Sequence, residues 1–171
     1  MNKVIFPGSF DPFHNGHLDI VKEALKVFDY VLIVVANNPN KNNYWFNENE
    51  RKKLIEKSIK NLENVKVVIE NIPIEDMCMK YKIFNVYRGV KAGRTIDEEI
   101  RLKNVTNYQS RIKYKKEINF IYTITSDADF RGSSIIKKYA HQRKCIEELI
   151  PKEIINDILN RYGEINNENN N

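Results

Sequence analysis

A continuous apolar run at residues 30–36, rich in β-branched side chains, constrains the fold more than any other segment. A strand with almost no polar residue is typical of a parallel sheet that helices cover on both faces. The run follows a shorter apolar run at residues 4–6 and a helical stripe of apolar residues between positions 18 and 28. Strand, helix and buried strand together predict a βαβ unit.

The same alternation continues along the chain and predicts an α/β fold. Further strands are expected at residues 65–69, 84–87 and 118–124. Helices are expected from the Asn47 cap with Glu50 at its third position, at residues 74–81, from the Thr95 cap through Val105, from Ser133 or Ser134 through Tyr139, and from Pro151 toward Leu159. The prediction is a doubly wound, Rossmann-like five-stranded parallel sheet with helices on both faces, in which ligand groups gather at the carboxyl ends of the strands.

The length of 171 residues favours one domain with a core large enough to fold without disulfides or a structural metal. The domain is expected to span residues 1–162. The Asn-rich residues 163–171 carry little apolar character, and a disordered tail is expected there.

Charge and cysteine content exclude few classes of protein. The formal net charge of +5, with both signs interspersed, favours anionic ligands only weakly. Cys78 and Cys145 are too few for a disulfide framework, which favours a reducing, cytoplasmic setting. The first strand begins too early to leave room for a signal peptide, and no apolar run reaches membrane-spanning length, so we expect a soluble chain.

The candidate site lies in the turn after the first strand, where residues 7–12 hold two prolines and a glycine. His14 and His17 follow at the start of the next helix. Backbone N–H groups, ring donors and the positive end of the helix dipole would meet there, which predicts a site for a phosphate anion. Two other interpretations remain: a structural histidine pair, or a metal site that lacks further assignable ligands.

Residues 8–12 and 14–20 together resemble the opening of the phosphopantetheine adenylyltransferases, a family of the H-x-G-H nucleotidyltransferase superfamily. The resemblance covers about residues 3 to 160. Arg88-Gly89-Val90-Lys91-Ala92 is similar to that family's Arg-Gly-Leu-Arg-Ala, and residues 130–135 are similar to its serine-rich helix start.

This resemblance implies transfer of an adenylyl group from ATP to 4′-phosphopantetheine, with Mg²⁺ accompanying ATP, in a homo-oligomer that is a hexamer in this family. The catalytic residues that it implies are His17, Lys41 and Arg88, and no protein ligand to a metal is implied. It implies contacts to phosphopantetheine by Ser9, Lys41, Ile74 and Arg88. It implies contacts to the nucleotide by Ser9, Phe10, His14, His17, Gly89, Val90, Lys91, Glu99, Phe130, Ser133 and Ser134.

The sequence departs from the family pattern at several positions. Lys91 replaces an arginine and gives up planar, bidentate contact, whereas Arg131 and Gly132 replace an isoleucine and a serine. His14 stands where this family often has threonine and where the nicotinate mononucleotide enzymes carry histidine. The alternative enzyme is therefore a nucleotidyltransferase that uses nicotinate mononucleotide, or another acceptor, in place of phosphopantetheine. A second alternative is a basic nucleic-acid-binding module, which would use Arg111, Lys113, Tyr114, Lys115 and Lys116. A run of this kind is more often a solvated loop before a strand. For an adenylyltransferase, we expect neither nucleic acid nor a membrane as a partner.

Overall fold

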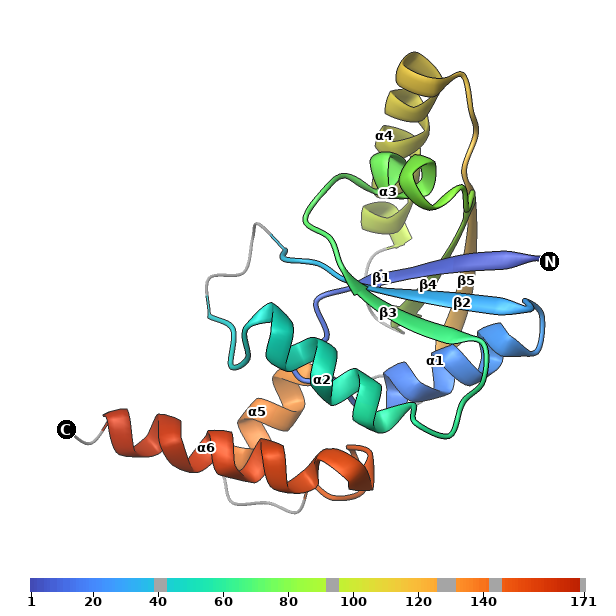
Figure 1. Cartoon of the computed structure of the whole chain (residues 1–171). Coiled ribbons are helices and arrows are strands. Elements are labelled where there is room, and N and C mark those ends of the chain that lie inside the picture. Colours follow the sequence, from blue (N-terminus) through green and yellow to red (C-terminus); the bar gives the residue numbers. More distant parts are fainter. Residues whose placement is uncertain (39–42, 92–95, 126–131, 142–145, 170–171) are drawn as a thin grey trace.

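The structure is a computed structural model that describes residues 1–38, 43–91, 96–125, 132–141 and 146–169 (Figure 1). Its strands are β1 (Lys3–Gly8), β2 (Tyr30–Val35), β3 (Val65–Ile69), β4 (Asn85–Lys91) and β5 (Asn119–Thr125). Its helices are α1 (Asn15–Leu25), α2 (Glu48–Ser58), α3 (Ile74–Tyr81), α4 (Ile96–Tyr114), α5 (Ser133–His141), a short 3₁₀ helix (Lys152–Ile154) and α6 (Ile155–Asn169).

The strands form one parallel sheet in the order β3-β2-β1-β4-β5, which confirms the predicted doubly wound fold. The central strand β1 pairs with β2 along its whole length, from Lys3 opposite Tyr30 to Gly8 opposite Val35. On its other side β1 pairs with β4. The chain order reverses at β1, and the carboxyl end of such a strand is where open α/β sheets hold their ligands.

Helices cover both faces of the sheet (Figure 1). α1, α2, α5 and α6 lie on one face, over a core that includes Val4, Phe6 and Ile33. α3 and α4 lie on the other face, over a smaller core that includes Ile5 and Leu32. Because successive side chains of a strand point to opposite faces, neighbouring residues of β1 and of β2 feed the two cores in turn.

Local sequence explains where α1 and α2 begin. Asn47 and Glu50 form the predicted capping box, in which each side chain accepts a hydrogen bond from the backbone N–H of the other residue. His14 caps α1 through a single hydrogen bond, which its ring accepts from the backbone N–H of His17. The caps therefore fix where α1 begins after β1 and where α2 begins after the segment that follows β2.

The structure differs from the sequence prediction mainly where elements end. β4 continues to Lys91, so Arg88 and Gly89 lie within the strand, because its backbone pairs with β5 as far as Lys91 opposite Thr125. α6 continues to Asn169, so the expectation that residues 163–169 are disordered is wrong at the level of the backbone. Helix propagation adds one hydrogen bond per residue, which carries a polar stretch onward from a packed amphipathic start.

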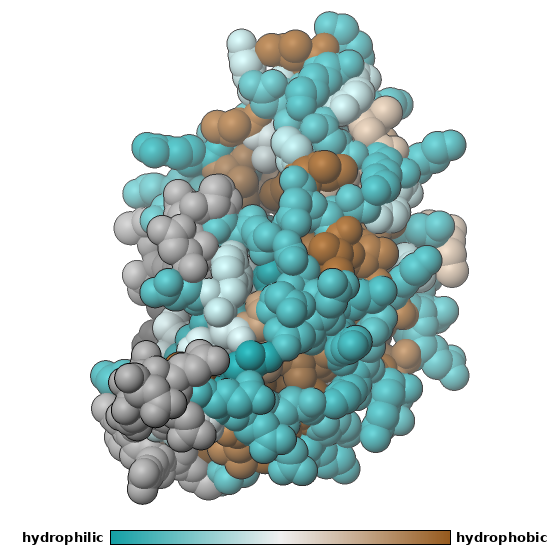
Figure 2. Space-filling model, turned by 60° about the vertical axis from the view of Figure 1, so that its left-hand side comes forward, coloured by the Kyte–Doolittle hydropathy of each residue, from teal (hydrophilic) through white to brown (hydrophobic). Residues whose placement is uncertain are grey.

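Part of the surface is apolar along α4. Figure 2 shows hydrophobic residues exposed in the upper part of the molecule, the height at which α4 lies in Figure 1. The exposed apolar side chains of this helix are Ile96, Ile100, Val105, Tyr108 and Ile112. Within the described ranges, no helix has the length and apolar content that crossing a bilayer would require.

Candidate active site

The first turn of α1 brings two imidazole rings together. The rings of His14 and His17 stack with centroids 3.6 Å apart and planes inclined by 23°. His14 is only 3% exposed, and its Nδ1 accepts from the His17 backbone N–H at 3.3 Å, so this nitrogen is already used as an acceptor. His14 therefore lies beneath His17 and supports it at the positive end of the helix dipole.

Phe10 packs against the same pair of rings. It is buried and adopts a left-handed backbone with φ of 49°, a conformation that costs free energy for a residue with a side chain. Its ring meets the His17 ring edge-on at 5.0 Å, and a Cβ placed on Gly8 would lie 2.7 Å from it. The glycine thus makes room for the Phe10 ring. Because this ring is buried, a ligand would contact the backbone of Phe10 and not its ring.

A buried carboxylate organises the turn between β1 and α1. Asp11 is 3% exposed and accepts hydrogen bonds from the backbone N–H groups of Trp45 and Phe46 at 3.0 to 3.1 Å. Its charge is met by the ammonium group of Lys137. Asp11 therefore joins three segments that are distant in sequence: the first turn, the segment before α2, and α5.

The side chain of Arg51 joins the ends of β1 and β2. This arginine of α2 is 1% exposed, and burial lowers the pKa of its guanidinium from its usual value. Its Nη1 donates to the carbonyls of Ser9 at 2.6 Å and Ala36 at 3.4 Å, and its Nη2 donates to Asn37 Oδ1 at 2.5 Å. The aromatic ring of Tyr44 lies 4.5 Å from the guanidinium.

The N-terminal end of α5 contacts the turn between β1 and α1. Ser133 Oγ donates to the carbonyl of Pro12 at 3.0 Å, and Lys137, one helical turn later, pairs with Asp11. Lys137 also donates to the carbonyl of Asn43 at 3.3 Å. These contacts place the N-terminal end of α5, with Ser133 and the exposed Ser134, beside the turn that carries the histidines.

Arg88 reaches the same region from β4. Its Nε and Nη2 atoms donate to the two carboxylate oxygens of Glu99 at 3.0 and 2.7 Å, and its Nη1 donates to the carbonyl of Pro7 at 3.3 Å. Both side chains are mostly buried, with 23% of Arg88 and 13% of Glu99 exposed. The guanidinium thus lies at the carboxyl end of β1, the edge of the sheet where ligand groups are expected.

Two other predicted residues have packing roles in the structure. A Cβ on Gly89 would lie 2.4 Å from Cδ1 of Ile20, so the glycine lets α1 pack closely on β4. Ile74, at the start of α3, packs against the core on the other face of the sheet. The backbone of Val90 and Lys91 continues β4 toward the predicted site.

Some predicted residues lie outside the described ranges. These are Lys41 and Phe130, together with Arg131 and the Thr95 cap. The side chain of Lys91 is also outside the description. Their predicted roles stay predictions.

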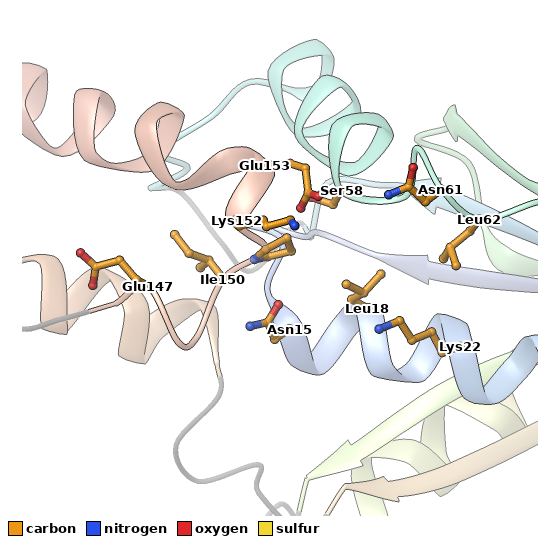
Figure 3. A pocket seen from close by; sticks show the side chains of 11 residues that line it. Asn15, Leu18, Lys22, Ser58, Asn61, Leu62, Glu147, Ile150, Lys152 and Glu153 are labelled. Carbon is orange, nitrogen blue, oxygen red and sulfur yellow. The ribbon is translucent and has the colours of Figure 1, made fainter.

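A hollow of about 440 Å³ lies between α1, the end of α2 and the segment before α6 (Figure 3). Its lining carries charges of both signs, with Lys22 and Lys152 against Glu147 and Glu153. None of the predicted site residues lines it. The hollow therefore lies on the side of α1 that carries Asn15 and Leu18, and neither histidine lines it.

The basic run near residue 111 connects helices. Arg111, Lys113 and Tyr114 lie in the last turn of α4 rather than in the expected loop. Lys113 donates to Glu75 and Asp76 at 3.1 Å, and the Tyr114 hydroxyl donates to Asp76 at 2.6 Å. Lys113 and Tyr114 therefore join α4 to α3, whereas Arg111 pairs with Glu117.

Sequence reasoning missed Arg51 and Lys137 and gave Asp11 no role beyond the bend. For Arg51 a pattern was present, because it shares the buried face of α2 with Leu54, Ile55 and Ser58. A basic residue on a buried face needs polar partners. For Lys137 the clue was its spacing of four from Ser133, which places both on one helix face.

The parallel sheet, the histidine pair after its central strand and the sequence of the whole domain place the chain in the cytidylyltransferase-like class of proteins. The family model described as cytidylyltransferase-like matches residues 5–138, a range that includes His17, Arg88 and Ser133. A crystal structure of the lipopolysaccharide core biosynthesis protein from Thermoplasma volcanium GSS1 shares the fold, with a TM-score of 0.54 at 23% identity over 71% of this chain and 95% of that one.

Curated relatives narrow the class. A phosphopantetheine adenylyltransferase of Clostridium botulinum (strain Alaska E43 / Type E3) is 35% identical over 94% of this chain and 98% of the relative. Those of Natranaerobius thermophilus and Staphylococcus haemolyticus are 35% and 34% identical over 94% and 89% of this chain, and over 96% and 91% of their own lengths. The chain belongs to the phosphopantetheine adenylyltransferase family, which confirms the resemblance seen in its motifs.

Proposed function

We propose that this enzyme transfers the adenylyl group of ATP to 4′-phosphopantetheine, giving dephospho-coenzyme A and pyrophosphate. The observation that carries the proposal is the convergence of two groups on the carboxyl end of β1. The His17 ring packs against Phe10 just beyond this strand, and Arg88 donates to the carbonyl of Pro7 within it. Family membership supplies the substrates, because the curated relatives carry the activity in their names.

The reaction needs positioning more than proton transfer. A phosphate oxygen of phosphopantetheine attacks the α-phosphorus of ATP, and the bond from that phosphorus to the oxygen bridging it to the β-phosphate breaks. The bonding electrons leave with pyrophosphate. The attacking phosphate is already an anion at neutral pH, so no strong general base is required. The rate then depends on holding two anions in line and on neutralising their charge.

The roles of the residues follow from this chemistry. His17 stabilises negative charge that develops on the α-phosphate. Arg88 and Lys41 bind the phosphate of phosphopantetheine and offset its repulsion from ATP. The turn and the start of α5 hold the nucleotide through backbone and hydroxyl groups. The nucleotide contacts in the proposal are Ser9, Phe10, His14, His17, Gly89, Val90, Lys91, Phe130, Ser133 and Ser134, and Ser9 and Ile74 also contact phosphopantetheine.

Magnesium enters the proposal as part of the substrate MgATP. Within the described part of the chain, no three histidine, cysteine or acidic side chains lie close enough to hold a metal ion. The carboxylate of Asp11 is engaged by backbone N–H groups and by Lys137. Mg²⁺ commonly binds through substrate phosphates and water.

Exposed apolar side chains on α4 support a homo-oligomer, a hexamer by analogy with the family. Ile100, Tyr108 and Ile112 are each about half exposed or more. An apolar face of this kind is typical of a surface that another chain covers. Light scattering of the wild type and of Ile112→Asp tests this proposal, and a smaller assembly is expected for the variant. We place the enzyme in the cytoplasm, where ATP is available and a free thiol such as that of Cys78 stays reduced.

A substrate panel tests the proposed function. Purified enzyme is given ATP or CTP with either 4′-phosphopantetheine or nicotinate mononucleotide, and pyrophosphate and the nucleotide product are measured. We expect turnover only with ATP and phosphopantetheine. Preference for nicotinate mononucleotide would instead support the sister activity that His14 suggests. Absence of turnover with every pair would overturn both.

A further inference from the structure

We infer that Lys137 is a positioning residue for the nucleotide, and that it acts on ATP binding through its ion pair with the buried carboxylate of Asp11. The pair fixes the start of α5, which carries Ser133 and Ser134. This inference rests on the proposed function, because it takes these two serines as contacts of the nucleotide. Neither member of the pair is among the ligand residues that the family resemblance implies.

One face of α5 meets two consecutive residues of the turn between β1 and α1. Ser133 and Lys137 are four residues apart in this helix, so their side chains project from the same face. The Ser133 hydroxyl donates to the carbonyl of Pro12 at 3.0 Å, and the Lys137 ammonium group donates to the carboxylate of Asp11. Two contacts one helical turn apart fix the position of the helix along its axis and its rotation about that axis.

The carboxylate of Asp11 is held in place independently of Lys137. It is 3% exposed and accepts hydrogen bonds from the backbone N–H of Trp45 at 3.0 and 3.1 Å and from that of Phe46 at 3.0 Å. Both donors belong to the backbone that leads into α2. The carboxylate therefore gives the lysine a fixed partner, and through this partner α5 takes a defined place beside the turn.

The contacts of Lys137 favour positioning over direct binding of a phosphate. Its side chain is 21% exposed, and its Nζ lies 5.4 Å from the centre of the Trp45 ring and donates to the carbonyl of Asn43 at 3.3 Å. The charge of Asp11 offsets that of Lys137, so the pair adds little positive potential for an incoming phosphate. The contribution of the pair to ATP binding is thus expected to come from the orientation of α5.

A double-variant comparison separates positioning from a direct contact. Asp11→Asn removes the negative charge but keeps one side-chain oxygen that can accept from the backbone N–H groups. If Lys137 acts through Asp11, Lys137→Met has little further effect once residue 11 is neutral. If its ammonium group contacted a phosphate of ATP, the loss on Lys137→Met would be the same in both backgrounds.

The test is calorimetric titration of ATP into the wild type, Lys137→Met, Asp11→Asn and the double variant. We expect Lys137→Met to raise the dissociation constant of ATP roughly ten-fold or more, the scale of one lost charge-assisted hydrogen bond. The double variant should bind ATP within about three-fold of Asp11→Asn. The KM for 4′-phosphopantetheine should change by less than about three-fold in Lys137→Met, because Trp45 and Phe46 still hold Asp11.

Two further variants serve as controls. Lys137→Arg keeps a cation that can pair with Asp11, so it should bind ATP more tightly than Lys137→Met does. Lys138→Met removes the same charge from an exposed position on α5 and should match the wild type.

Other outcomes would overturn the inference. Equal losses from Lys137→Met in both backgrounds would assign Lys137 to a direct contact with ATP. Wild-type affinity for ATP in Lys137→Met, together with a lower unfolding temperature, would show that the pair only stabilises the fold. Failure of the wild type to use phosphopantetheine would instead overturn the proposed function, and the titrations with ATP would still test this inference.

A variant that leaves Asp11 unpaired in a buried place can fail to fold. If Lys137→Met does so, the comparison of Asp11→Asn with the double variant gives the decision. An equal loss of ATP affinity in these two variants supports the inference. Wild-type affinity in both, or weaker binding by the double variant than by Asp11→Asn, contradicts it.

Discussion

The guanidinium of Arg51 donates a 2.6 Å hydrogen bond to the carbonyl oxygen of Ser9, and thereby ties α2 to the turn that follows the central strand. The same group donates to Asn37, just after β2. A charge buried to 1% exposure is retained only where polar partners surround it. Arg51 therefore holds the carboxyl ends of β1 and β2 together behind the site.

Replacing Arg51 should destabilise the fold. In Arg51→Met the partly buried Ser9 carbonyl loses its donor, and we expect the free energy of unfolding to fall by about 2 kcal/mol. Urea denaturation measures this change. Lys53→Met, on the exposed side of the same helix, is the matched control and should remain within about 0.5 kcal/mol of the wild type. Equal stability of the two variants would contradict the structural role of Arg51.

The His17 ring should matter for turnover more than for binding. In His17→Ala we expect kcat to fall by about 100-fold or more, the usual effect of removing one donor to a developing negative charge. The dissociation constant for ATP should change much less. Calorimetric titration and steady-state kinetics measure the two quantities, with Glu23→Gln on the exposed side of α1 as control. Near-normal turnover in the alanine variant would remove His17 from the mechanism.

Gly89 is expected to be required for helix packing. A Cβ at this position would lie 2.4 Å from Cδ1 of Ile20, so Gly89→Ala should lower the free energy of unfolding by about 1 kcal/mol through overpacking. Ile20→Val removes that methyl group. Gly89→Ala should therefore cost less free energy of unfolding in the Ile20→Val background than in the wild type. Additive losses in thermal unfolding would exclude this contact as the cause.

Stability should depend on the ionisation of Glu70. Hydrogen bonds from Lys80 and then Tyr81, each 2.5 Å long, lower the pKa of this carboxyl group below its usual value of 4.5. Because the folded-state pKa is the lower one, ionised Glu70 stabilises the fold above pH 4.5, and this contribution disappears as the pH falls through the folded-state pKa.

Comparing the wild type with Glu70→Gln measures this contribution. The difference in free energy of unfolding should be largest near neutral pH and should shrink as the pH falls below 4.5 and through the lowered pKa of Glu70. Glu63→Gln, at an exposed position before β3, is the control. A difference that stays constant from neutral to acid pH would show that Glu70 acts by packing alone.

Local hydrophobic patterns predicted the bounds of strands and helices well where neighbours in the sequence determine whether a residue is buried. The strand Val65–Ile69 and the helix Ile74–Tyr81 have the predicted bounds, because their hydrophobic patterns begin and end sharply. β4 was predicted too short because Arg88 interrupts the apolar run. Its charge is satisfied by Glu99, eleven residues later in the sequence, which the strand's own pattern does not reveal.

The site was predictable only in part, for a related reason. The histidines lie in one short motif at a helix start, and their chemistry follows from that position. Asp11 and Lys137 are separated by 126 residues and meet only when α5 folds against the first turn. A contact of this length depends on the whole topology, so residues that organise the site from a distance appear only in the structure.

The stereochemistry of transfer tests the central claim most directly, namely that fixed positive groups align two anions for one in-line displacement. The enzyme is given phosphopantetheine and a single diastereomer of adenosine 5′-O-(1-thiotriphosphate), and the configuration at the phosphorus of the product is determined. One in-line displacement predicts inversion of that configuration. Retention would mean that an adenylyl group first bonds to the protein, and it would contradict the account.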